Sequence, residues 1–233
     1  MKITERPTNF QIFKVHKSPK LYQMSLCSLK NEDFGWSQKS IGNKDGSFVN
    51  HGFWQSSCRI NDRLVYLIGG ADDPLEFLAY PKKEPPISAS LVGLGDCHSF
   101  VFDSFKMKDH RMYPACVYHN ASKTVYVLGG LKKNGSENHW LPSASKFSIA
   151  KKDSYKDLTD MESPLMGISA VIPEPNKVPA VIYLAGLSDD SHVKVIKLED
   201  SDKGSTWSVI GTYYYDYMFS SLIPLRKAPQ DHF

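Results

Sequence analysis

Three short apolar runs that end in glycine set the pattern of the chain. The best preserved is 124–130, Thr-Val-Tyr-Val-Leu-Gly-Gly, and similar runs occur at 64–70 and, with a single glycine, at 181–187. Their central tyrosines are 60 and 57 residues apart. β-Branched and aromatic residues favour strands, and an unbroken apolar run is typical of a strand buried on both faces. Recurrence at nearly constant spacing predicts a repeat protein.

The alternation of apolar runs and turn residues predicts four antiparallel strands, named a to d, in each of three repeats. The repeats cover approximately residues 53–108, 112–161 and 166–211, and each glycine-terminated run is a strand b. No stretch has the sustained 3.6-residue periodicity of a helix. The expected strands are 53–60, 64–68, 97–102 and a segment around residue 105; then 113–118, 124–128, 144–149 and 155–158; then 167–172, 181–185, 193–198 and 207–210.

An apolar strand that contains an aromatic residue and ends in a glycine pair, with another aromatic residue downstream, resembles the kelch repeat, the unit of a β-propeller. The resemblance implies an all-β, kelch-type propeller whose b strands lie near a common axis. The residues that carry it are the b-strand tyrosines Tyr66, Tyr126 and Tyr183, the glycines Gly69, Gly70, Gly129, Gly130 and Gly186, and the downstream aromatic residues Trp36, Tyr155 and Trp207.

Both ends of the chain carry strand-like segments outside these repeats. Residues 10–15, 21–26 and the segment around Trp36 fit strands b, c and d, and 217–225 resembles strand a. Residues 1–45 with 217–225 would complete a fourth blade, so that about four blades of four strands close a ring and hide their edges. The alternative is an incomplete fragment of a larger propeller, because kelch propellers usually have more than four blades.

The composition fits one folded domain over residues 1–233, since 41% of the residues are hydrophobic and 23% are charged. A net charge of +3 without any basic run argues against nucleic acid and anionic membranes as partners. No apolar stretch reaches the length of about 18 residues needed for a membrane span. The first residues lack the apolar segment of a signal peptide. A cytoplasmic location is therefore expected.

The sequence offers no recognisable catalytic or metal-binding pattern. The four cysteines form no Cys-x-x-Cys pair, and the eight histidines have no His-x-x-x-His spacing. A nucleophile elbow and a phosphate-binding loop are also missing. We expect no catalytic residue, metal or cofactor. The kelch resemblance leaves an enzyme as the alternative, since some kelch-like propellers are copper oxidases or sugar-acid isomerases.

Strand direction predicts which loops share a face. Antiparallel strands alternate, so the b–c loops emerge on the same side as the d–a linkers between repeats. The b–c loops at 71–96 and 131–142 are long, and long loops on a rigid scaffold commonly carry function. The candidate partner-binding residues on this face are Tyr80, His110, Arg111, Tyr113, Lys132, Lys133, Asn134, His139 and Trp140.

Two of these candidates have a second interpretation. Arg111 matches an arginine that the kelch family often carries before strand a, where it can be structural. Trp140 either packs its own loop or contacts a partner. We expect a non-catalytic scaffold or adaptor that binds another protein or peptide through this face, because aromatic and arginine side chains are common binding hot spots. Lysine pairs at 82–83 and 132–133 favour a ligand of acidic character.

Overall fold

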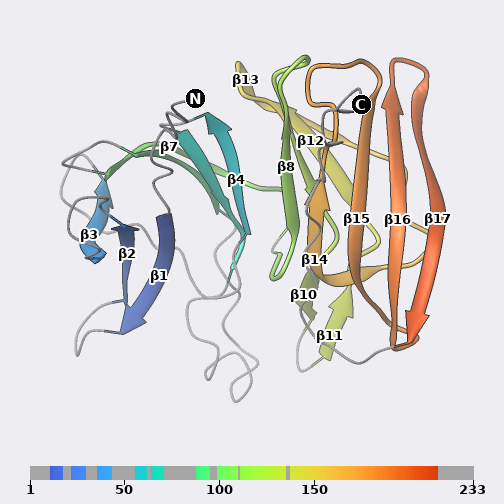
Figure 1. The fold of residues 1–233 in the computed structure, drawn as a ribbon, viewed down its shortest axis with the longest axis horizontal. Helices are drawn as coiled ribbons and strands as arrows, with labels where there is room; N and C mark the ends of the chain where they lie inside the picture. The colour runs from blue at the N-terminus through green and yellow to red at the C-terminus, as the bar shows by residue number, and fades with distance from the viewer. Residues whose placement is uncertain are drawn as a thin grey trace, which may run out of the picture.

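The computed structural model describes residues 11–17, 22–29, 36–43, 56–61, 64–70, 88–94, 99–109, 111–134 and 137–214. Within these ranges the chain forms strands and turns and no helix, so the predicted all-β class is confirmed for this part of the chain. The strands belong to four sheets, and none of these sheets closes on itself (Figure 1). Accordingly, the described residues include no helix that could cross a membrane.

The second and third repeats form four-stranded meanders, as predicted. In the second repeat the strands are β8 (Ala115–His119), β9 (Thr124–Leu128), β12 (Ala144–Ser148) and β13 (Lys151–Asp157), in that spatial order. In the third they are β14 (Leu165–Val171), β15 (Ala180–Ser188), β16 (His192–Ser201) and β17 (Gly204–Tyr214). All neighbouring pairs in both sheets are antiparallel.

The first repeat also contains four consecutive strands, but the third was placed wrongly from the sequence. They are β4 (Ser56–Asn61), β5 (Leu64–Ile68), β6 (Ser88–Leu94) and β7 (Ser99–Lys106). The third strand, β6, lies within the loop expected at 71–96, and the segment expected as strand c belongs to the fourth strand. The prolines of that loop end at position 86, and the following residues alternate small polar and apolar side chains, which suits a strand.

The N-terminal strands extend the sheet of the first repeat instead of forming a separate fourth sheet. They are β1 (Gln11–Lys17), β2 (Tyr22–Leu29) and β3 (Trp36–Asn43), close to the predicted positions. β3 pairs in parallel with β7, which gives the order β1-β2-β3-β7-β6-β5-β4. The pairing satisfies backbone groups at the outer edge of β7, which no hairpin rule could assign in advance. The segment expected at 217–225 lies outside the described residues.

The first strands of the three repeats lie beside one another, with β8 in contact with both β4 and β14 (Figure 1). The tyrosine-bearing second strands, expected near a common axis, lie one strand farther from these contacts within their sheets. β9 is nevertheless buried on both faces, as its apolar run predicts. Val125 and Val127 belong to the core shared with the first repeat, and Tyr126 and Leu128 belong to the core shared with the third.

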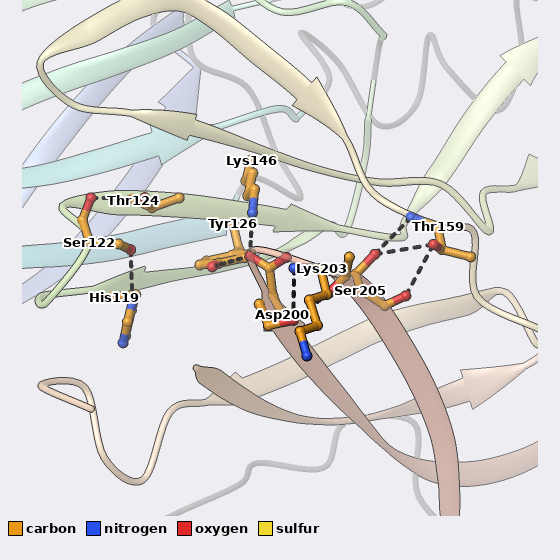
Figure 2. A network of polar contacts seen from close by, with 11 residues as sticks. His119, Ser122, Thr124, Tyr126, Lys146, Thr159, Asp200, Lys203 and Ser205 are labelled. Carbon is orange, nitrogen blue, oxygen red and sulfur yellow. Dashed lines mark hydrogen bonds and ion pairs between the residues drawn. The ribbon is translucent and has the colours of Figure 1, made fainter. Parts of the chain in front are cut away.

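Aromatic rings and one polar cluster join the repeats internally. The Phe147 ring meets Tyr66 edge-on at a centroid distance of 5.5 Å and stacks on Tyr155 at 5.6 Å. Between the second and third repeats, the Tyr126 hydroxyl donates to Asp200 at 2.6 Å, and Lys146 donates to the same carboxylate (Figure 2). Burial, followed by the contact with Asp200, raises the pKa of Tyr126. The phenol therefore keeps its proton and remains the donor.

Glycine pairs form the joints between consecutive repeats. Gly69 and Gly70 have φ values of +72° and +101°, and Gly129 and Gly130 have +57° and +101°, so the expected use of glycine at these strand ends is confirmed. The Gly70 N–H donates to the Arg111 carbonyl at 2.8 Å, and the Gly130 N–H donates to the Leu165 carbonyl at 3.0 Å. Each second glycine therefore bonds to the segment that starts the next repeat.

The third repeat uses its single glycine differently. Gly186 lies within β15, where it needs no positive φ. A Cβ there would lie 2.9 Å from the Met166 carbonyl, so glycine permits close approach of the neighbouring strand β14.

We expect Gly130→Ala to reduce the free energy of unfolding more than Gly204→Ala does. Both positions have a positive φ, of +101° and +133°, so each alanine carries a conformational cost of about 1–3 kcal/mol. A Cβ at Gly130 would also lie 2.6 Å from the Met112 carbonyl oxygen, whereas no atom lies within 4 Å at Gly204. Urea unfolding of the two variants measures the difference. Equal losses would show that the joint tolerates a side chain.

The cluster around Asp200 should behave as a coupled unit. Hydrogen bonds to charged groups contribute about 1.5–3 kcal/mol. Tyr126→Phe and Asp200→Ala should therefore each destabilise the fold, and a double-mutant cycle should show coupling between them because each removes the same bond. Chemical denaturation of the two single variants and the double variant provides the cycle. Strictly additive losses would mean that this bond contributes nothing to joining the repeats.

Candidate functional site

The b–c loop of the second repeat contains a hairpin. β10 (Leu131–Asn134) pairs with β11 (Glu137–Trp140), with Leu131 opposite Trp140 and Lys132 opposite His139. Residues 131–142 were expected to be a loop without strands. Gly135 followed by Ser136, the two residues between the strands, is a recognised hairpin signal that could have revealed them. The hairpin lies at the lower end of the molecule in Figure 1, where β15 joins β16 and β17 ends.

The hairpin is fixed to the linker that precedes β8. Met112 and Leu131 exchange two backbone hydrogen bonds, of 2.9 and 2.7 Å. Their side chains are buried together, and Tyr113, Trp140 and Met166 pack against them while remaining partly exposed. Trp140 thus packs its own loop and still presents part of its ring to solvent.

Arg111 lies beneath this surface rather than on it. Only 3% of the residue is exposed. Its guanidinium donates to the carbonyl oxygens of Gly129 at 3.0 Å and Ser143 at 2.8 Å, and to the Ser143 hydroxyl at 2.9 Å. Burial lowers its pKa, and the nearby Tyr155 and Asp109 oppose that shift. The guanidinium nevertheless remains protonated at neutral pH, because the pKa of arginine is so high. Arg111 therefore connects the ends of β9 and β12, as the structural interpretation of this residue proposed.

The exposed part of the surface carries both signs of charge. Lys132 lies 3.3 Å from Asp109, and both are partly exposed. His139 lies 3.7 Å from Glu137, and both are well exposed. Lys132 is thus already compensated by Asp109. The lysine excess that suggested an acidic ligand is offset in the part of this surface that the structure describes.

The structure brings together five of the nine candidate residues: Arg111, Tyr113, Lys132, His139 and Trp140. For Lys133 and Asn134 it describes the backbone of β10. Tyr80 and His110 lie outside the described residues.

The third repeat has its own polar contacts at the same end of the molecule, where β15 joins β16 (Figure 1). The Lys194 ammonium lies 2.7 Å from Asp190 and 2.9 Å from the Ser163 hydroxyl. The hydrogen bonds from Lys194 and Ser188 hold the pKa of Asp190 well below its usual range. His192 contacts the Tyr214 ring at a centroid distance of 5.4 Å. The pairing of Asp190 with Lys194 holds the turn between β15 and β16 in place.

The opposite end of the molecule holds turns whose polar groups bond to one another. The His119 ring is buried, donates from Nε2 to the Lys177 carbonyl at 2.7 Å, and accepts at Nδ1 from the Ser122 hydroxyl at 2.7 Å. Asn120 donates to Asn176 at 2.6 Å. These contacts join the a–b turns of the second and third repeats. The polar side chains named here therefore serve the fold, unlike His139 and Lys132 at the other end.

Comparison with known proteins provides no closer identification. No protein-family model matches the chain, and no curated protein matches it significantly. Among the described residues, no three His, Cys, Asp or Glu side chains gather in a way that could hold a metal ion.

We expect Arg111→Lys to destabilise the protein by at least about 2 kcal/mol, because lysine cannot reproduce the three bonds of a planar guanidinium. Lys132→Ala is the matched control. It removes a partly exposed ion pair, and such pairs contribute less than about 1 kcal/mol. Thermal and urea unfolding measure both effects. A stable Arg111→Lys protein would show that the buried guanidinium is not needed to hold β9 and β12 together.

Proposed function

We propose that this protein is a non-catalytic binding module of the kelch-propeller type that presents the β10–β11 hairpin and the adjoining linker to another protein. Support for the architecture comes from three successive four-stranded meanders, joined at glycines, with their first strands side by side. The described part of the chain is consistent with both earlier alternatives, a ring of four blades or a piece of a larger one.

The observation that carries the binding proposal is the combination of a fixed base with an exposed surface. The hairpin is held at its base by the bonds between Met112 and Leu131. Above that base it presents part of Trp140 together with His139 and Lys132. A surface that is already ordered loses little conformational entropy on binding. Partly exposed aromatic side chains in such a surface are common hot spots.

The ligand chemistry follows from the ion pairs on this surface. A carboxylate on a partner would compete with Asp109 for Lys132 and would also meet His139. The exchange costs little, because a partly exposed ion pair contributes less than about 1 kcal/mol. Tyr113 and Trp140 would contact an apolar or aromatic side chain of the same segment. We therefore propose a peptide or loop that combines an acidic residue with an apolar one.

Affinity capture with the full chain, followed by mass spectrometry, should yield the partner. Its binding should weaken by about 1–2 kcal/mol for each of Lys132→Ala, His139→Ala and Trp140→Ala, the range typical of moderate hot spots. Isothermal titration calorimetry measures the affinity. His139→Ala is the cleanest variant, because His139 is exposed and its removal should leave the melting temperature unchanged.

Asn120→Ala and Asn176→Ala are the controls, because these residues join two turns at the opposite end of the molecule. They should leave the affinity unchanged. Loss of binding in the asparagine variants, with full affinity in the three hairpin variants, would place the interaction on the a–b turns instead.

A further inference from the structure

Exposed apolar side chains are concentrated on β17. Val209, Ile210, Tyr213 and Tyr214 are 49, 53, 58 and 89% exposed, and they are four of the five large apolar residues that are exposed within the described ranges. β17 is the longest described strand, with eleven residues, and forms the outer edge of the third sheet (Figure 1). No described strand pairs with its outer side.

The outer strands of the other two repeats are protected, each in a different way. β7 is covered by β3, which pairs with it in parallel. β13 has the sequence Lys-Lys-Asp-Ser-Tyr-Lys-Asp, so five of its seven residues are charged. Charged residues and an added strand are the usual means of keeping a sheet edge from pairing with another chain. β17 has neither form of protection among the described residues, since its eleven residues include no charged side chain.

β17 retains only a local obstacle to pairing. Its register against β16 shifts once, because Ile196 faces Val209 while Val195 faces Gly211, which leaves Ile210 as an extra residue. Such a bulge twists an edge locally. From Gly204 to Val209 the strand pairs regularly with β16, so alternate residues there direct their backbone groups to the outer edge. The Ser205 carbonyl already accepts from the Thr159 hydroxyl at 3.1 Å, so pairing with a second chain would begin beyond Ser205.

We propose that β17 pairs with β17 of a second copy of this chain, antiparallel and about a two-fold axis, so that two four-stranded sheets become one eight-stranded sheet. The lack of charge indicates a second copy as the occupant. The residue on a two-fold axis meets its own counterpart, and the others meet residues of the same strand on the far side of the axis. A charge on the axis would therefore face a like charge, which destabilises a strand pair. An uncharged strand avoids this conflict.

Two other properties favour the same occupant. The chain has a net charge of only +3, so two copies repel each other weakly. The exposed Val209, Ile210, Tyr213 and Tyr214 provide β-branched and aromatic side chains, the types that stabilise cross-strand pairs. This interface goes beyond the proposed function. It uses the edge of the sheet, whereas partner binding uses the strand ends, so either can fail without the other.

Sedimentation velocity over a range of concentrations tests the dimer. The full-length chain should change from its monomer mass of 26.3 kDa to twice that value as concentration rises. The double variant Ile210→Lys with Tyr213→Lys should remain monomeric at every concentration. Val178→Lys is the matched control, because Val178 is equally an exposed apolar residue, at 70%, but lies in a turn outside the strands. It should dimerise like the original chain.

Hydrogen exchange locates the contact. Amides of residues 204–214 should become more protected as concentration rises, and the double variant should lose this gain while keeping the original melting temperature. A chain that stays monomeric up to millimolar concentration overturns the proposal. A dimer that survives the double substitution also overturns it. Amides of 204–214 that face away from β16 but are protected independently of concentration would overturn it as well, because β17 would then be covered within its own chain or by another partner.

Discussion

The glycine pairs that follow β5 and β9 are the constraint on which the rest of the fold depends. At Gly70 and Gly130 the backbone takes a positive φ, and the glycine N–H bonds to the segment that opens the next repeat. Arg111 connects the two joints. Its carbonyl accepts from Gly70, while its guanidinium donates to the carbonyl of Gly129. One linker residue thus fixes both the preceding strand end and the following one, and the hairpin at Leu131 takes its position from this linker.

The tyrosine at the centre of strand b makes a different contact in the first and second repeats. The Tyr66 ring packs edge-on against Phe147 of the second repeat, and the Tyr126 hydroxyl bonds to Asp200 of the third. Each therefore reaches into the repeat that follows. A strand buried on both faces needs residues that satisfy two neighbours, and tyrosine provides an apolar ring with a polar end. Joints at the strand ends and tyrosines at the strand centres together hold consecutive repeats in register.

The sequence was enough to predict strands whose positions depend on neighbouring residues alone. The run at 124–128 is β9 to the residue, and the two later meanders follow the predicted order. The missed strand β6 follows a proline-rich loop that obscured its short pattern, and the pairing of β3 with β7 depends on a contact between segments almost sixty residues apart. In the site, the linker and the b–c loop were correctly expected to meet. Arg111 was placed among the partner-binding residues because arginine is a common hot-spot residue. Three acceptors beside the strand ends instead make its burial possible.

The same repeated unit leaves very different outer strands, and this difference has a physical origin. Inner strands touch neighbouring repeats on both sides, so packing restricts their composition. An outer strand contacts its own repeat along one edge only, which leaves its other edge to be covered by β3, charged as in β13, or bare as in β17. The loops at the strand ends face a different constraint. The sequence of a b–c loop can vary as long as the first residues of the loop still bond to the linker beside the glycine pair. Selection can therefore change the exposed side chains of the hairpin and those of β17 separately, whereas Ser205 and Trp207 of β17 are constrained by their bonds to Thr159 of the second repeat.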